Sequence, residues 1–339
     1  LFGRLENGET FAIRDTRQRP HFYVDEESAD AIDGAAMKPS ATRAFDGRSL
    51  IKVEVKLPSD APGVRDKLHG LGLKTYEADV RFAMRYLIDR DIKSGIKIHG
   101  QPVPGTGTKW LFENPEVAPA RVDARPRVLS FDIETTPDAN NLLAIAYFGL
   151  GRDEVVVVDP KARQMPDRAI GVPTEKDALH HFAELVQALD VDILTGWNVV
   201  DFDLAVLSNI ASKVRYDLQL GRDRGKMRIR PAQGYFGSGS AMIPGRMVLD
   251  GMDLVRGAFV RVDDYTLDGV SQAILGEGKT LGHGEDGLDK VAQILDTYAS
   301  DLPKFTEYAR TDARLALAIV EKLDLIKLAF ARASLTGMT

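Results

Sequence analysis

The sequence has 339 residues, of which 44% are hydrophobic and 28% are charged, so it has the composition of a folded protein rather than a disordered one. A net charge of −6 excludes a strong overall attraction to nucleic acid, which would need a local basic surface. The absence of cysteine excludes disulfides and cysteine-ligated zinc and fits a cytoplasmic location. We expect no membrane association, because no apolar run approaches the ~18 residues of a membrane helix.

Two domains are predicted from the length and from a change in pattern along the chain. Residues 1–105 show short alternating runs such as 49–56, typical of a smaller β-rich α+β domain. Residues 106–126 are predicted to be a linker, because the surrounding stretch is rich in Pro and Gly. Residues 127–339 are predicted to form the second domain.

The second domain is predicted to be of the α/β class. The pattern predicts strands at 128–133, 142–148, 154–159 and 191–195, and helices at 175–189, 201–214 and 303–331. Three strands followed by alternating helix and strand indicate a mixed sheet covered by helices.

Two acids lie on the first of these strands. Asp132 and Glu134 are two positions apart, so both side chains leave the same face, while Leu129, Phe131 and Ile133 take the opposite face. Two such carboxylates can share a cation. The alternative is an exposed strand with ordinary acids, because the chain holds 50 acidic residues and a short motif is weakly specific.

A third acid, Asp203, follows the predicted strand 191–195 and a turn at Gly196. Ligand sites of α/β sheets gather at such strand ends, which favours Asp203 and the preceding Asn198 as site residues. The alternatives are an acid in the first turn of a helix, stabilised by the helix dipole, or a helix cap supplied by Asp201.

The fourth acid, Asp312, interrupts the apolar stripe of a predicted helix. Tyr308 lies one turn earlier on the same face. A buried carboxylate is unfavourable without a partner, and a metal ion would supply one. The alternative for Tyr308 is a core aromatic with a solvated hydroxyl. Four acids of this kind, brought together, would form the arrangement of a two-metal phosphodiesterase.

A basic stretch lies between the third and fourth acids. Its charged residues Arg222, Arg224, Lys226, Arg228 and Arg230 occupy alternate positions, so on an extended strand they would form one cationic face. Tyr235 and Phe236 could stack on bases. The alternative is a solvated loop.

Taken together, the segments 129–136, 198–203 and 308–312 resemble the Exo I, Exo II and Exo III motifs of the DEDD 3′–5′ exonucleases. The position five before Asp312 is Glu307 rather than His, so the resemblance is to the tyrosine subclass. It implies an RNase H-like fold for the second domain.

Further segments are similar to the N-terminal part of family B DNA polymerases, with the bacterial DNA polymerase II branch most alike. They read Tyr-Glu-Ala-Asp-Val at 76–80 and Arg-Tyr-Leu-Ile-Asp-Arg at 85–90. The family's polymerase motifs, Ser-Leu-Tyr-Pro-Ser and Tyr-x-Asp-Thr-Asp, do not occur. The resemblance therefore implies part of a larger polymerase, with its polymerase domain in cis and a sliding clamp as a further partner.

The resemblance implies a metal-dependent 3′–5′ proofreading exonuclease acting on single-stranded DNA or the frayed primer of a primer–template. Asp132, Glu134, Asp203 and Asp312 would hold two Mg²⁺ ions, with Mn²⁺ as a substitute, and Tyr308 would orient the attacking water. Asn198 and Phe202 would contact the terminal nucleotide, and Arg224, Lys226 and Arg228 are predicted to bind the DNA strand. The implied location is the bacterial cytoplasm, at the nucleoid.

Two other functions remain open at this point. One is a non-catalytic DNA-binding or scaffold module with a degenerate site, against which the presence of all four acids and Tyr308 argues. The other is a free-standing exonuclease of the same superfamily, against which the segments between 76 and 90 argue.

Overall fold

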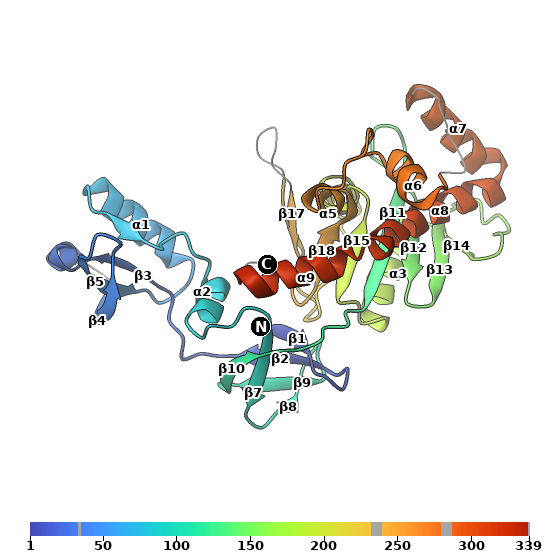
Figure 1. Cartoon of the computed structure of the whole chain (residues 1–339). Coiled ribbons are helices and arrows are strands. Elements are labelled where there is room, and N and C mark those ends of the chain that lie inside the picture. Colours follow the sequence, from blue (N-terminus) through green and yellow to red (C-terminus); the bar gives the residue numbers. More distant parts are fainter. Residues whose placement is uncertain (33–34, 232–238, 279–286, 338–339) are drawn as a thin grey trace.

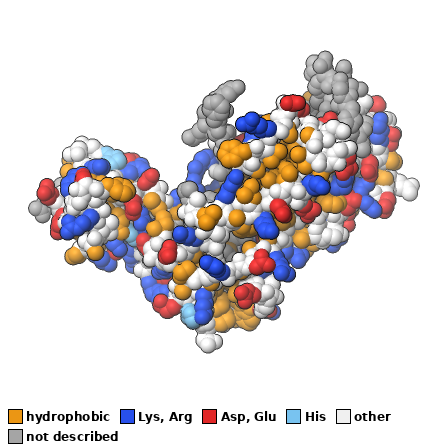
Figure 2. Space-filling view, in the orientation of Figure 1, with side chains coloured by type: hydrophobic (Ala, Val, Ile, Leu, Met, Phe, Trp, Pro, Cys, Tyr) orange, Lys and Arg blue, Asp and Glu red, His pale blue; other side chains and the backbone are white. Residues whose placement is uncertain are grey.

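The computed structural model describes residues 1–32, 35–231, 239–278 and 287–337. Figure 1 shows a smaller N-terminal part, coloured blue to cyan, beside a larger α/β part, and Figure 2 shows the surface hollowed between them. No helix in the described part of the chain is both long enough and apolar enough to cross a membrane.

The N-terminal part is built from small sheets, as expected of a β-rich α+β domain. Its largest sheets have the strand orders β1-β2-β9-β8 and β4-β5-β3-β6, and a two-stranded sheet joins β7 to β10. The strands are β1 (Phe2–Arg4), β2 (Thr10–Arg14), β3 (His21–Asp25), β4 (Ala36–Arg43), β5 (Ser49–Glu54), β6 (Thr75–Tyr76), β7 (Gly95–His99), β8 (Val103–Pro104), β9 (Trp110–Glu113) and β10 (Glu116–Ala120). Helices α1 (Asp60–Gly70) and α2 (Phe82–Ile88) and the short turn η1 (Glu26–Ala31) accompany them.

The stretch 106–126, predicted to be a linker, contains β9 and β10. Strand β9 pairs in parallel with β2, and β10 pairs antiparallel with β7. Phe112 of β9 packs edge-on against Phe11 of β2, with ring centroids 6.2 Å apart. Sheet pairing, of β9 with a strand far away in the sequence and of β10 with a nearer one, therefore gives this Pro- and Gly-rich stretch a structure that local composition did not predict. The limits of the two domains stay a prediction.

A six-stranded mixed sheet forms the centre of the larger part. Its order is β14 (Ala169–Val172), β13 (Arg152–Val158), β12 (Leu142–Gly149), β11 (Val128–Thr135), β15 (Ile193–Gly196) and β18 (Met247–Asp250). Strand β12 is antiparallel to both of its neighbours, β11 and β13. Strands β15 and β18 run parallel to β11. The predicted mixed sheet is thereby confirmed.

Helices cover both faces of this sheet (Figure 1). On one face, Leu129 and Phe131 of β11 pack with side chains of α3 (Glu175–Ala188) and α4 (Ala205–Lys213). On the other face, side chains of β12 and β13 pack with Phe305 and Tyr308 of α8 (Leu302–Lys322). The polar face of β11 therefore lies under α8.

Several elements differ from the sequence prediction. The single helix expected at 303–331 is two helices, α8 and α9 (Leu325–Thr336), separated at Asp324, whose φ is +52°. The helix expected at 201–214 begins as a π-helical turn, η2 (Val199–Leu204), before α4. The sequence did not predict β14, β18, α5 (Gly251–Gly257), α6 (Leu267–Leu275) or α7 (Gly287–Ser300).

Candidate active site

Strand β11 presents two acids to α8. Its apolar residues Leu129, Phe131 and Ile133 are buried in the core on the opposite face. Because side chains alternate along a strand, that anchoring turns Asp132 and Glu134 toward α8. Glu134 is 8% exposed and Asp132 is partly buried, so neither is an ordinary surface acid.

Helix α8 supplies the partner residues from the other side. Tyr308 and Asp312 are each 3% exposed, and Phe305, Leu315 and Ile319 of the same helix are all buried. Asp301 caps the helix by accepting a hydrogen bond from the backbone N–H of Lys304 at 3.1 Å.

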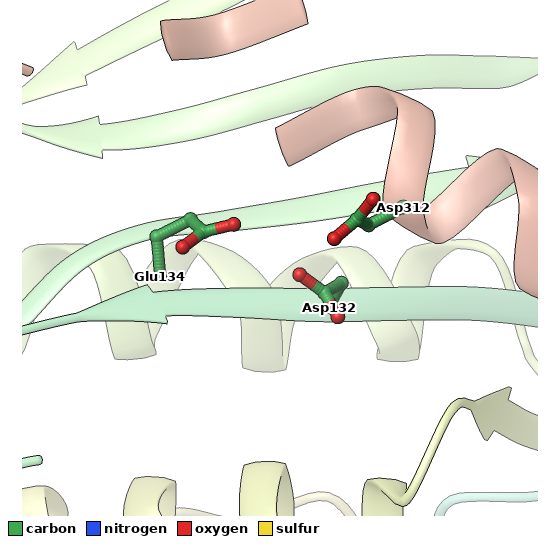
Figure 3. A group of neighbouring side chains, drawn as sticks. All are labelled: Asp132, Glu134 and Asp312. Atoms are coloured by element: carbon green, nitrogen blue, oxygen red, sulfur yellow. The ribbon is translucent and has the colours of Figure 1, made fainter. Parts of the chain in front are cut away.

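Three carboxylates meet between the strand and the helix. Oxygen atoms of Asp132, Glu134 and Asp312 all lie within 4.8 Å of one another, and Figure 3 shows the three groups converging from β11 and α8. Carboxylates this close repel one another unless a cation lies among them. Hard oxygen ligands are those that Mg²⁺ prefers, so the residues present fit a divalent metal ion.

The hydroxyl of Tyr308 belongs to the same site. Burial raises its pKa above the usual range, and the charges of Glu134, Asp312 and Asp132 raise it further, as does a hydrogen bond with Asp312. The phenol is therefore protonated at neutral pH and remains a hydrogen-bond donor.

Asp203 lies beside these acids but outside the group of three. It is 2% exposed, and its Oδ1 accepts a hydrogen bond from the backbone N–H of Ile133 at 3.0 Å. Strand β15 pairs with β11 only as far as Ser130 and Thr195, so Asp203 bonds β11 beyond the end of that pairing. Burial raises its pKa well above the usual value, and the charge of Asp132 raises it further.

The turn that leads to Asp203 has little freedom. A Cβ atom on Gly196 would lie 2.5 Å from the carbonyl oxygen of Phe131, so the turn passes close to β11. Asn198 then takes a left-handed conformation with φ of +60°, and the π-helical turn η2 follows. Such π turns often occur at functional sites. Phe202 on this turn is 40% exposed, and Asn198 is partly buried. Their contact with a nucleotide stays a prediction.

Sequence reasoning missed Asp250, the last residue of β18. It is 7% exposed and accepts hydrogen bonds from backbone N–H groups of both α5 and η2. Burial raises its pKa, as does the nearby charge of Asp253. The available signal was an acid directly after a short apolar run, which is typical of a helix cap.

The predicted single cationic face from Arg222 to Arg230 is wrong. Only Arg228–Arg230 are in a strand, β16, which pairs with β17 (Ser240–Met242). Residues 221–225 form a turn in which Arg224 has φ of +58°. Arg222 is buried and bonds to Asp190 at 3.0 Å, because burial of a guanidinium requires an acidic partner.

Two of the three side chains of this stretch that were predicted to bind DNA are exposed and also engage acids. Arg224 lies 3.3 Å from Glu184, and Lys226 lies 3.0 Å from Asp217. Their role, like that of the exposed Arg228, stays a prediction. The predicted stacking residues Tyr235 and Phe236 lie outside the described residues.

Comparison with known proteins shows to which family the chain belongs. Residues 73–270 match the family described as DNA polymerase family B, exonuclease domain. The chain belongs to this family. The match begins within the predicted N-terminal domain and includes Asp132, Glu134 and Asp203. The resemblance to family B DNA polymerases is thereby confirmed.

Relatives and a solved structure agree with the family. DNA polymerase II of Escherichia coli K12 is 29% identical over 310 residues, which are 90% of this chain and 38% of that protein. A DNA polymerase of Archaeoglobus fulgidus is 26% identical over 341 residues, covering 92% of this chain and 39% of the relative. The family B DNA polymerase structure from Pyrobaculum calidifontis aligns with a TM-score of 0.78 at 23% identity, over 99% of this chain and 44% of that one. The fold class is confirmed, and the chain spans under half of each of these proteins.

Proposed function

We propose that this protein is a 3′–5′ exonuclease that removes nucleotides from the 3′ end of single-stranded or frayed primer DNA. The observation that carries the proposal is the group of three carboxylates under α8, with the Tyr308 hydroxyl beside them. The family supplies the nuclease class, and the 3′–5′ direction and the DNA substrate are the proposed part.

The residues have separate roles in this proposal. Asp132, Glu134 and Asp312 would hold divalent metal, with Asp203 reaching the site from the side of Asp132. Two ions, Mg²⁺ or Mn²⁺, would supply an activated water and stabilise the leaving 3′ oxygen. The neutral phenol of Tyr308 can donate a hydrogen bond and so orient that water. The hydrolysis breaks the P–O3′ bond and releases a nucleoside monophosphate.

Because the net charge of the protein is negative, DNA has to be bound by a local group of basic side chains. Figure 2 shows basic and acidic side chains interspersed on the visible face, in keeping with a net charge of −6. We propose that Arg228, together with Arg224 and Lys226, contacts phosphates and that the exposed ring of Phe202 stacks on a base. We also propose a polymerase domain in the same polypeptide and a sliding clamp as partners, since the relatives are DNA polymerases of greater length.

The proposal is tested with purified protein and single-stranded DNA labelled at its 5′ end. We expect stepwise shortening from the 3′ end in Mg²⁺, no cleavage in EDTA, and slower cleavage of an RNA strand. Changing Asp132 and Glu134 together to Ala should reduce the rate by more than the ~100-fold typical of an outer-shell partner, while cooperative unfolding persists. An undiminished double variant would contradict the site, and binding without cleavage by the native protein would favour a scaffold module.

A further inference from the structure

A buried carboxylate that the proposed chemistry does not use lies at the end of β18. Asp250 caps α5, because its side chain accepts hydrogen bonds from the backbone N–H groups of Met252 at 2.9 Å and Asp253 at 3.3 Å. These bonds use only its Oδ1 atom and satisfy two of the N–H groups that a helix leaves open at its start. A cap alone would require no more than this.

The same carboxylate also reaches the turn that carries Asp203. Its Oδ1 accepts a hydrogen bond from the backbone N–H of Asn198 at 3.3 Å, and its Oδ2 accepts one from Val200 at 3.4 Å. Asn198 is the left-handed residue directly before η2, and Val200 lies in its first turn. Asp250 therefore joins the starts of α5 and η2.

The far end of η2 is fixed by a second bond. Asp203, three residues after Val200, accepts a hydrogen bond from Ile133 of β11. The turn is thus held by Asp250 of β18 at its start and by β11 at its end. Since β18 and β11 flank β15 in one sheet, the turn is bonded to both neighbours of β15.

We propose that Asp250 is a positioning residue, which holds the first turn of η2 and thereby sets the place of Asp203 beside Asp132. Its two oxygens accept hydrogen bonds from two backbone N–H groups at the start of the turn, so one buried carboxylate can hold the turn at both Asn198 and Val200. The proposal rests on the proposed function for the role of Asp203, but its structural part can be measured without any nuclease activity.

Two substitutions separate the cap from the positioning role. Asp250→Ser keeps an oxygen that can cap α5 but is too short to reach Asn198 and Val200. Asp250→Asn keeps Oδ1 and replaces the Oδ2 acceptor that faces Val200. Two controls match them. Thr266→Ala removes the cap of α6, where Thr266 accepts from Gly269 at 3.1 Å, and Asp253→Asn removes a neighbouring charge.

The first measurement is hydrogen exchange of the amides at 198–204 in metal-free protein. Asp250→Ser should speed exchange at Asn198 and Val200 by up to about tenfold, because each of these amides loses its hydrogen-bond acceptor. Asp250→Asn should do so at Val200 alone, and neither control should change these amides. The second measurement is the rate of DNA cleavage at saturating Mg²⁺. In Asp250→Ser, kcat should fall roughly 10- to 100-fold, with little change in KM for DNA.

Unchanged exchange and unchanged kcat in both Asp250 variants would overturn the proposal and leave Asp250 a helix cap only. An equal fall of kcat in Thr266→Ala would also overturn it, since loss of any cap would then suffice. If the native protein cleaves no DNA, the proposed function fails, whereas the exchange measurement still decides whether Asp250 holds the turn.

Discussion

The acids at the two ends of strand β15 differ in their charged neighbours. Before its first residue, Asp190 and Asp192 meet Arg4 of β1 and the buried Arg222. Burial opposes ionisation of Asp192, but hydrogen bonds from Arg4 and Arg222 outweigh it, and its pKa is lowered. Beyond its last residue, burial raises the pKa of Asp203, and the charges of Asp132 and Asp250 raise it further. At the first end, ion pairs with arginines neutralise the acids and connect the two parts of the chain. At the second end, acids lie near one another, and a metal ion would balance their charge.

The largest expected effect on stability is at the neutralised end. Arg222→Met removes a charge that is 3% exposed and leaves Asp190 and Asp192 without one of their bonds. Breaking a fully buried pair by removing one partner typically costs about 3–5 kcal/mol. Because the side chains of Asp190 and Asp192 are 37% and 12% exposed, the free energy of unfolding should fall by less than that. Urea unfolding measures it, with Arg125→Met, at a side chain 88% exposed, as the control. Equal effects at both positions would contradict a structural role for Arg222.

At the end of β15 near Asp203, removing a charge should have the opposite effect and raise the free energy of unfolding. The pKa of Asp203 is higher in the folded protein than in the unfolded chain. The stability that its protonated form contributes is therefore fully present at a pH below the pKa of the unfolded chain, and it is lost as the pH rises through the pKa of the folded protein. Asp203→Asn should therefore make the metal-free protein more stable at neutral pH, by about 1.4 kcal/mol for each pKa unit that separates the two states. The gain should vanish below about pH 4, the ordinary range of Asp.

Denaturation of the native protein and Asp203→Asn in EDTA from pH 4 to pH 8 checks this expectation. Asp192→Asn is the matched substitution at the other end of β15, and it should destabilise instead. A loss of stability in both variants would show that the two ends do not differ in the way described.

A smaller effect is expected at Tyr308, which orients water in the proposed reaction. Tyr308→Phe should lower kcat by on the order of 100-fold or less, because one transition-state hydrogen bond is removed. Mn²⁺ affinity, measured by calorimetry, should hardly change, since the three carboxylates remain. Tyr298→Phe is the control, because its hydroxyl bonds to the Val158 carbonyl in the same apolar cluster. Loss of Mn²⁺ binding in Tyr308→Phe would contradict a water-orienting role.

The smallest effect concerns the exposed bases. Replacing Arg224, Lys226 and Arg228 with Ser should flatten the slope of log affinity against log salt by roughly 0.7 for each phosphate that the protein no longer neutralises. Because Arg224 and Lys226 already pair with acids, we expect the change that corresponds to one phosphate rather than to three. Binding to single-stranded DNA in Ca²⁺ measures it, with Arg125→Ser as the control. An unchanged slope would place the DNA path elsewhere.

Local spacing was enough to determine part of this protein from its sequence. The alternation around Asp132 and Glu134 predicted their common face, and the spacing of four between Tyr308 and Asp312 predicted their common helix face. The mixed sheet also followed from the order of the apolar runs. These features depend on the repeat of a strand or a helix, which can be recognised from the spacing of apolar and charged residues along the sequence.

Only the tertiary structure decided the remainder. It turned Arg222 inward toward Asp190 and Asp192, although an alternating pattern predicted a cationic strand. It bonded Asp203 to Ile133, 70 residues away, and joined Asp250 to the turn at Asn198, 52 residues away. The physical reason is that such contacts depend on which strands pair and where each pairing ends, and neither is contained in the local period of any segment.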